Sequence, residues 1–237
     1  MKILITGGSR GIGAECVRRF CAEGNTVSFI YNSSDRKAGE LSKETGALAI
    51  KADVADIAAL KLAVGVAARK MEGIDVLVNN AGVSLIKLFT DVTEDELGHV
   101  FGVNLIGATI AAREASRAML KEHFGRIINI GSVWGRTGAS CEAVYSASKA
   151  GLEGLTKALA KELGPSGITV NCVEPGVIDT EMNSELDNET LEELKNETPL
   201  CRIGKVDDVA NVVLWLASEN AGFVTGQIIG VDGGFGL

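Results

Sequence analysis

Histidine, cysteine and proline are scarce in this chain, and their scarcity argues against several kinds of site. Only two histidines, His99 and His123, occur among 237 residues, which disfavours a histidine-based metal centre or a Ser-His-Asp triad. The five cysteines are an odd number without a CxxC pair, so neither a disulfide framework nor a zinc site is indicated. Three prolines and no low-complexity tract leave no sign of a linker.

Long apolar runs are missing as well. The longest uncharged stretches, such as Val100 to Ala112, fall short of the ~18 apolar residues that a membrane span needs. The opening MKILITGG lacks the apolar core and the cleavage site of a signal peptide. We therefore expect a cytoplasmic protein without a membrane segment. The net charge of −8 disfavours nonspecific binding to nucleic acid, because that binding needs basic residues to replace phosphate counterions.

Glycine and apolar residues, by contrast, are abundant, and their pattern predicts one α/β domain over residues 1–237. Short β-branched or apolar runs alternate with helical patterns over 10–23, 34–45, 55–72, 93–122 and 144–163; the runs are KILIT, TVSFIY, ALAIK, IDVLVN, RIINIGS, ITVNCV and QIIGV. Such alternation predicts a Rossmann-like, doubly wound parallel sheet of about seven strands with helices on both faces. Ligands of such sheets bind at the carboxyl ends of the strands.

A glycine-rich loop, TGGSRGIG, follows the first predicted strand and leads into a helix. Gly7, Gly11 and Gly13 would permit a tight turn and a close approach of the backbone to a pyrophosphate at the helix N-terminus. The alternative reading is a simple turn. The position directly after an N-terminal strand favours a dinucleotide site.

The residues after the second predicted strand bear on the choice between NAD and NADP. Sites that prefer NAD commonly carry an acid there, ~20 residues beyond the loop, which binds the ribose hydroxyls. Here Tyr31, Asn32 and Ser33 occupy the place, and the Arg10 guanidinium in the loop would suit a 2′-phosphate. This combination favours NADP(H). Asp35 is the one nearby acid, and we expect it to cap the following helix.

Six motifs in order resemble those of the short-chain dehydrogenase/reductase family, over essentially the whole chain. They are TGGSRGIG, NNAG at 79–82, NLIG around Asn104, Ser132 thirteen residues before Tyr145, YSASK at 145–149, and PGVIDTEM at 175–182. Within the family, the second half is most similar to bacterial 3-oxoacyl-[acyl-carrier-protein] reductases, although relatives with other ketone substrates share those segments. The resemblance implies reduction of a ketone to a secondary alcohol.

The resemblance also implies roles for individual residues. The implied catalytic tetrad is Asn104, Ser132, Tyr145 and Lys149. The resemblance implies cofactor contacts for Tyr145, Lys149 and the residues named above in the glycine-rich loop and after the second strand. It implies further cofactor contacts for Ser9, Ile12, Asp53, Val54, Asn79, Ala81, Gly82, Pro175, Gly176, Ile178 and Thr180. For Asp53, a helix cap is an equally good reading.

Tyr145 and Lys149 are four residues apart and share one face of a predicted helix. Alone, such a pair is typical of a packing residue beside a solvated charge. In the family context Tyr145 is the proton donor, and we expect the ammonium of Lys149 to lower its pKa of ~10. Ser132 would donate a hydrogen bond to the substrate oxygen, and Asn104 would anchor a water beside Lys149. Capping is the alternative reading for both.

The substrate is expected to be chosen by the loop 133–143 and by the acidic segment 183–205. Predicted substrate contacts are Trp134 and Glu142, together with Ser132 and Tyr145. Glu142 either faces solvent or selects a substrate with an amine or hydroxyl, and Cys141 reads as loop packing. Segment 183–205 is either a mobile lid or a solvated helical hairpin.

The predicted reaction is NADPH-dependent reduction of a 3-oxoacyl thioester in fatty-acid synthesis, on an acyl carrier protein or coenzyme A. Another small ketone or alcohol, such as a polar metabolite or steroid, is the alternative, and a nucleotide-sensing module is disfavoured by the intact tetrad. An acidic carrier protein would need basic residues near the active site, but the expected docking turns hold only His123 and Ser166. The basic residues Arg113, Arg117 and Lys121 lie instead on a helix that the resemblance places at a subunit interface. The resemblance implies a homotetramer or homodimer.

Overall fold

The computed structural model describes residues 1–181 and 187–237, and a parallel sheet of seven strands forms its centre. The strands are β1 Lys2–Thr6, β2 Thr26–Tyr31, β3 Leu48–Lys51, β4 Val76–Asn79, β5 Gly125–Ile130, β6 Ile168–Pro175 and β7 Ile228–Val231. Their order in the sheet is β3-β2-β1-β4-β5-β6-β7. The order therefore reverses between β1 and β4, which confirms the predicted doubly wound sheet and places a ligand crevice there.

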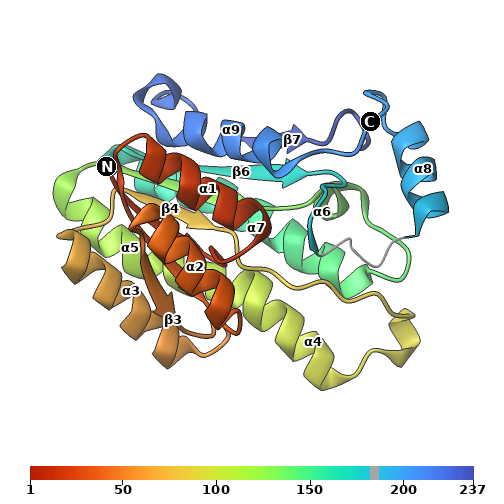
Figure 1. Cartoon of the computed structure of the whole chain (residues 1–237), viewed down its shortest axis with the longest axis horizontal. Coiled ribbons are helices and arrows are strands. Elements are labelled where there is room, and N and C mark those ends of the chain that lie inside the picture. The colour runs from red at the N-terminus through yellow and green to blue at the C-terminus, as the bar shows by residue number, and fades with distance from the viewer. Residues whose placement is uncertain (182–186) are drawn as a thin grey trace.

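Helices cover both faces of this sheet (Figure 1). On one face lie α1 Gly11–Ala22, α2 Asp35–Thr45 and α9 Val206–Ala217; on the other lie α3 Ile57–Met71, α5 Ala108–Glu122 and α7 Ala143–Leu163. Because side chains alternate along a strand, Ile3 and Ile5 join the first core and Leu4 joins the second. Burial on both faces explains why the central strands are continuous apolar runs.

The helix expected over 93–122 is divided into three parts. It consists of α4 Glu94–Phe101, a π-helical segment Gly102–Gly107, and α5. A Cβ on Gly107 would lie 2.8 Å from the carbonyl oxygen of Val54, so glycine allows the helix to approach the loop after β3. A π-helical turn inside a helix is frequently found at a functional site.

Other expectations need correction. The sequence patterns did not indicate α6 Val133–Thr137 or α9, whereas α8 Asn188–Glu197 lies in the segment for which a helical hairpin was one reading. Asp35 does not cap α2: it is the first residue of that helix, and its carboxylate pairs with Lys51 at 2.7 Å. Of the proposed lid, 183–186 lies outside the described residues, and α8 begins after Asp187, whose side chain accepts from the N–H of Thr190 at 2.8 Å.

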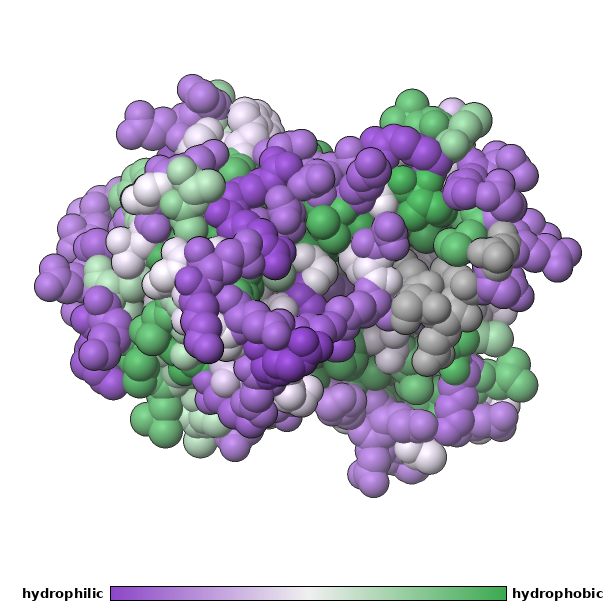
Figure 2. Space-filling view, in the orientation of Figure 1, coloured by the Kyte–Doolittle hydropathy of each residue, from purple (hydrophilic) through white to green (hydrophobic). Residues whose placement is uncertain are grey.

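Polar residues dominate the face of the molecule shown in Figure 2, and hydrophobic residues appear there as separate patches. Over the described part of the chain, no helix combines the length and the apolar character that crossing a membrane requires.

Candidate active site

A cleft of about 590 Å³ opens at the carboxyl ends of the strands. Its walls come from the segments that follow β1 through β6 and from α7. Of the residues predicted to bind cofactor or substrate, the cleft is lined by Gly7, Ser9, Arg10, Gly11, Ile12, Tyr31, Asn32, Ser33, Asp53, Val54, Ala81, Gly82, Ser132, Tyr145, Lys149, Pro175, Gly176, Ile178 and Thr180. Residues distant in sequence therefore meet at the edge of the sheet where the strand order reverses.

The glycine-rich loop is built for close approach. Gly7 has a φ of +65°, which favours glycine, and a Cβ on Gly13 would lie only 2.4 Å from the carbonyl oxygen of Gly7. The N-cap of α1 is Arg10, whose side chain makes no capping hydrogen bond. The first N–H groups of α1 are thus without a side-chain cap, as an anion-binding helix N-terminus requires.

Asn80 braces this loop, and sequence reasoning missed it in favour of Asn79. The Asn80 amide donates to the carbonyl oxygens of Thr6 at 3.1 Å and Gly7 at 2.9 Å, and Asn80 lines the cleft. Asn79 is buried instead, and its amide donates to Asn129 Oδ1 at 2.9 Å. The two neighbours point in different directions, and Asn80, not Asn79, lines the cleft.

Asn104 lies in the π-helical segment, where it is completely buried, and it does not cap a helix. Its Oδ1 accepts from the N–H of Val83 at 2.9 Å, while its Nδ2 donates to the Val83 carbonyl at 3.0 Å and to Ser148 Oγ at 3.0 Å. Asn104 therefore fastens the segment after β4 to α7, and the sequence gave no sign of Ser148 as its partner.

Ser132, Tyr145 and Lys149 meet in the cleft, where all three are buried. Ser132 caps α6, because its Oγ accepts from the N–H of Trp134 at 3.2 Å, and its side chain also lowers the pKa of Tyr145. The capping and functional readings of Ser132 are thus compatible. Lys149 Nζ donates to the carbonyl oxygen of Ile130 at 2.8 Å and lies 5.6 Å from the centre of the Tyr145 ring.

The acid–base properties of this group differ from the expectation. Burial raises the pKa of Tyr145 to about 12, a hydrogen bond from Ser132 opposes the rise, and the charge of Glu142 adds to it. Burial also lowers the pKa of Lys149 to about 8. The pKa of Tyr145 thus moves up and not down as expected, because desolvation is the largest contribution. Tyr145 accordingly holds its proton at neutral pH.

Other predicted site residues lie away from the cleft or are engaged elsewhere. The Trp134 ring packs edge-on against Phe235, with ring centres 5.4 Å apart, and neither Trp134 nor Glu142 lines the cleft. Glu142 is half-buried at the start of α7 rather than facing solvent, and burial raises its pKa. Asp53 accepts from the N–H of Ala55 at 2.8 Å, and Asp56, not Asp53, caps α3.

Glu181 is a cleft residue that sequence reasoning did not single out. Its carboxylate lies 3.8 Å from Arg10 Nη1 and also pairs with Lys37 Nζ. Two cations and one carboxylate thus meet at the cleft, where the loop after β1 approaches the segment after β6. Among residues 1–181 and 187–237, no cluster of three or more His, Cys, Asp or Glu side chains is arranged to hold a metal ion.

Comparisons with known proteins agree with this geometry. Residues 7–236 match the family described as enoyl-(acyl carrier protein) reductase. The 3-oxoacyl-[acyl-carrier-protein] reductase FabG of Aquifex aeolicus is 39% identical over 236 residues, which cover 98% of this chain and 95% of that protein. A short-chain dehydrogenase/reductase from Serratia marcescens superposes with a TM-score of 0.93 at 41% identity, covering 99% of this chain and 97% of the other.

A blue fluorescent protein from a metagenomic library, solved in complex with NADPH, gives the same figures: a TM-score of 0.93, 41% identity, and coverage of 99% and 97%. Full-length identity at this level, together with the cleft and the buried Ser132, Tyr145 and Lys149, fixes the relationship. The chain is an oxidoreductase that belongs to the short-chain dehydrogenase/reductase family.

Proposed function

We propose that this enzyme reduces a 3-oxoacyl thioester to the 3-hydroxyacyl thioester with NADPH. The observation that carries the proposal is the buried group of Ser132, Tyr145 and Lys149 at the end of a dinucleotide-sized cleft. The substrate class is supported by full-length relatives named 3-oxoacyl-[acyl-carrier-protein] reductase.

The residues of the cleft fit a nicotinamide dinucleotide phosphate. The tight turn that Gly7 and Gly13 permit, and the N–H groups of α1 that lack a side-chain cap, suit a pyrophosphate. At the end of β2, Tyr31, Asn32 and Ser33 line the cleft without a carboxylate, and the nearby Asp35 is paired with Lys51. Arg10 and Lys37 share the single carboxylate of Glu181, so the three side chains together keep one net positive charge, which suits a 2′-phosphate.

When bound, the cofactor supplies the hydride that reaches the ketone carbon. The protein supplies the rest. Tyr145 donates its hydroxyl proton to the ketone oxygen, and Ser132 Oγ donates a hydrogen bond to the same oxygen as negative charge develops on it. Lys149, held by the Ile130 carbonyl, places positive charge beside the Tyr145 ring and so stabilises the phenolate left after proton transfer. Asn104 braces this arrangement through Val83 and Ser148.

The acyl thioester could be presented on an acyl carrier protein or on coenzyme A, and the charges of α5 bear on this choice. Arg113 and Arg117, two of the three basic residues of α5, both pair with Glu114, at 2.9 and 2.7 Å, which reduces their attraction for an acidic carrier protein. We therefore propose that turnover depends on the 3-oxoacyl thioester and only weakly on its carrier. A homotetramer or homodimer and a cytoplasmic location, implied by the family resemblance, stay predictions.

The test is NADPH oxidation with 3-oxoacyl thioesters of coenzyme A and of acyl carrier protein, with NADH and an enoyl thioester run in parallel. The expected result is turnover of both 3-oxoacyl thioesters with NADPH and none of the enoyl thioester. Reduction of the enoyl thioester alone, or tight NADPH binding without turnover of any 3-oxoacyl thioester, would overturn the proposed substrate class.

Arg10→Ala is expected to weaken NADPH binding by about 10- to 100-fold and NADH binding hardly at all, because a charge-assisted contact with the 2′-phosphate is lost. Kd values for both cofactors from fluorescence titration check this. The matched control is Arg113→Ala, an arginine on α5 paired with Glu114. Equal weakening for both cofactors would show that Arg10 does not read the 2′-phosphate.

Asn80→Ala is expected to raise the Kd for NADPH about tenfold and to lower the free energy of unfolding by about 1–2 kcal/mol, because the carbonyls of Thr6 and Gly7 lose their donor. Asn25→Ala is the control, since the Asn25 amide also bonds a main-chain carbonyl, that of Phe20, but does not line the cleft. Denaturation and cofactor titration measure the two effects. A cofactor affinity unaffected by Asn80→Ala would show that Asn80 does not shape the loop.

A further inference from the structure

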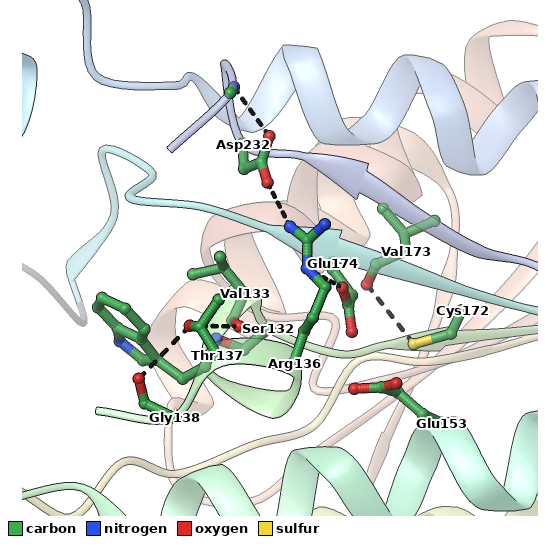
Figure 3. A network of polar contacts seen from close by, with 12 residues as sticks. Ser132, Val133, Arg136, Thr137, Gly138, Glu153, Cys172, Val173, Glu174 and Asp232 are labelled. Atoms are coloured by element: carbon green, nitrogen blue, oxygen red, sulfur yellow. Dashed lines mark hydrogen bonds and ion pairs between the residues drawn. The ribbon is translucent and has the colours of Figure 1, made fainter. Parts of the chain in front are cut away.

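A second group of titratable side chains lies beside the Ser132 backbone and has no part in the reaction above (Figure 3). It comprises Glu153 of α7, Glu174 of β6, Arg136 of α6 and Asp232, just after β7. Glu153 follows Lys149 by four residues, one helical turn further along α7. Glu174 directly precedes Pro175, the last residue of β6, which lines the cleft. The group thus connects the three elements that carry the catalytic and cofactor residues.

The two glutamates each leave one carboxyl oxygen without a donor. Oε1 of Glu153 and Oε1 of Glu174 are buried, and neither accepts a hydrogen bond from any donor in the described part of the chain. Buried carboxylate oxygens are normally satisfied, because leaving one unpaired is costly. Burial above all, and then the neighbouring carboxyl group of Glu153, raise the pKa of Glu174 to about 7. One proton held between the two carboxyl groups would give both a partner.

Arg136 joins the glutamates to the helix that Ser132 caps. Its Nε lies 3.6 Å from Glu174 Oε2, and its Nη2 donates to Asp232 Oδ2 at 2.8 Å. In Figure 3 the Arg136 side chain extends from α6 between Glu174 and Asp232. Arg136 therefore links Glu174 and Asp232 to α6, the helix whose N-cap is Ser132.

The backbone on both sides of Ser132 packs against the two carboxyl side chains. A Cβ on Gly131 would lie 3.2 Å from Glu174 Cγ, and a Cβ on Gly135 would lie 3.0 Å from Glu153 Oε1. Because so little space separates each glutamate from this backbone, a shift of either carboxyl group toward it would displace the Ser132 segment.

We propose that Glu153 and Glu174 share one proton and act, with Arg136 and Asp232, as a positioning group that holds Ser132 for catalysis. Loss of that proton to solvent leaves two carboxylates against each other, and their repulsion moves the Ser132 segment. Turnover then falls as the pH rises, while cofactor binding is retained. The kinetic part of this inference rests on the proposed ketone reduction, but the shared proton does not.

The charged and titratable groups that face Glu174 define what else can titrate there. They are Arg136 from α6, Glu153 from α7, Asp232 after β7 and Cys172 on β6 itself; Lys149 and Lys157 of α7 act on Cys172 and Glu153 respectively. Burial raises the pKa of the Cys172 thiol to about 12, so it stays neutral at physiological pH. Lys149, with its pKa lowered to about 8, is the other group that changes charge nearby.

Glu153→Gln separates these contributions, since a glutamine amide donates to Glu174 at every pH and has no proton to lose. Wild-type turnover is expected to begin falling near pH 7, whereas the variant keeps its activity until Lys149 loses its proton near pH 8. Glu153→Ala removes the bond and is expected to lower kcat about tenfold even at about pH 6, with the Kd for NADPH unchanged. Glu162→Gln, an exposed site on α7, is the matched control.

Infrared difference spectra of the substrate-free enzyme, between about pH 6 and pH 9, test the proton without any turnover. The shared proton is supported by a protonated-carboxyl band that disappears as the pH is raised, is absent in Glu153→Gln and is present in Glu162→Gln. This result would stand even if no 3-oxoacyl thioester is reduced. In that case the proposed substrate fails and the pH profiles are taken with whichever ketone is turned over. A wild-type spectrum without the band, or identical pH profiles for wild type and Glu153→Gln, overturns the proposal.

Discussion

Tyr145→Phe is expected to reduce kcat by a factor of about 100 to 10,000, the range typical of a lost general acid. The substitution removes the only hydroxyl proposed to protonate the ketone oxygen, while the phenyl ring still fills a site that is 8% exposed. Cofactor affinity should change by less than about threefold, because the tyrosine hydroxyl adds little to binding. Steady-state kinetics with NADPH and a titration of NADPH binding measure both quantities.

Ser132→Ala serves as the comparison for this prediction. It removes one hydrogen-bond donor from the developing negative charge and the cap of α6, so a smaller loss of kcat, about 100-fold, is expected. If Tyr145→Phe retained wild-type turnover, Tyr145 would not be the proton donor, whatever the result for Ser132→Ala.

Lys149→Met is expected to abolish most activity and yet to stabilise the protein. Activity should fall by about 100-fold or more, because the charge beside Tyr145 is lost. Stability should rise, because lowering the Lys149 pKa from 10.5 to about 8 by burial costs on the order of 3 kcal/mol at neutral pH. The Ile130 carbonyl loses its donor at a cost of ~1–2 kcal/mol, which leaves a net gain of about 1–2 kcal/mol.

The pH dependence of this gain fixes its cause. Below about pH 8 Lys149 is charged in both the folded and unfolded states, so the full penalty weakens the wild-type fold. Between about pH 8 and 10.5 the folded state releases the proton while the unfolded state keeps it, so wild-type stability rises with pH. The advantage of Lys149→Met in denaturant unfolding should therefore shrink over this range. An advantage that is constant with pH, or a variant less stable at pH 7, would contradict a buried-charge penalty.

The sheet and most of the cleft could be predicted because they depend on local pattern. Central strands are buried on both faces and appear as continuous apolar runs, and the glycine loop must be glycine where Gly13 approaches Gly7. Since most cleft segments follow a strand of one parallel sheet, predicting the strands also predicts most of the residues that converge.

The errors have a different origin, since they concern contacts between distant segments. Nothing in the neighbouring sequence distinguishes Asn79 from Asn80. Only the folded structure shows that the Asn80 amide bonds the loop after β1, whereas the Asn79 amide bonds Asn129. Asp35 was expected to cap a helix, but Lys51 on β3 takes its carboxylate. The rise in the Tyr145 pKa reflects burial by the whole fold, which a helical spacing of four residues does not reveal.

The Glu153–Glu174 pair is the clearest case. In the sequence both residues look like ordinary charges, one in a helix and one at the end of an apolar strand. Only the packing of α6, α7 and β6 places them together and buries their oxygens.

The most direct test of the proposed reaction is a single turnover with NADPH that carries deuterium at nicotinamide C4 and a 3-oxoacyl thioester, followed by mass spectrometry of the product. We predict a 3-hydroxyacyl thioester with one deuterium at C3, formed rapidly by the wild type and hardly at all by Tyr145→Phe. Deuterium at C2 or C3 of a saturated product from an enoyl thioester, with none transferred to the 3-oxoacyl thioester, would contradict ketone reduction.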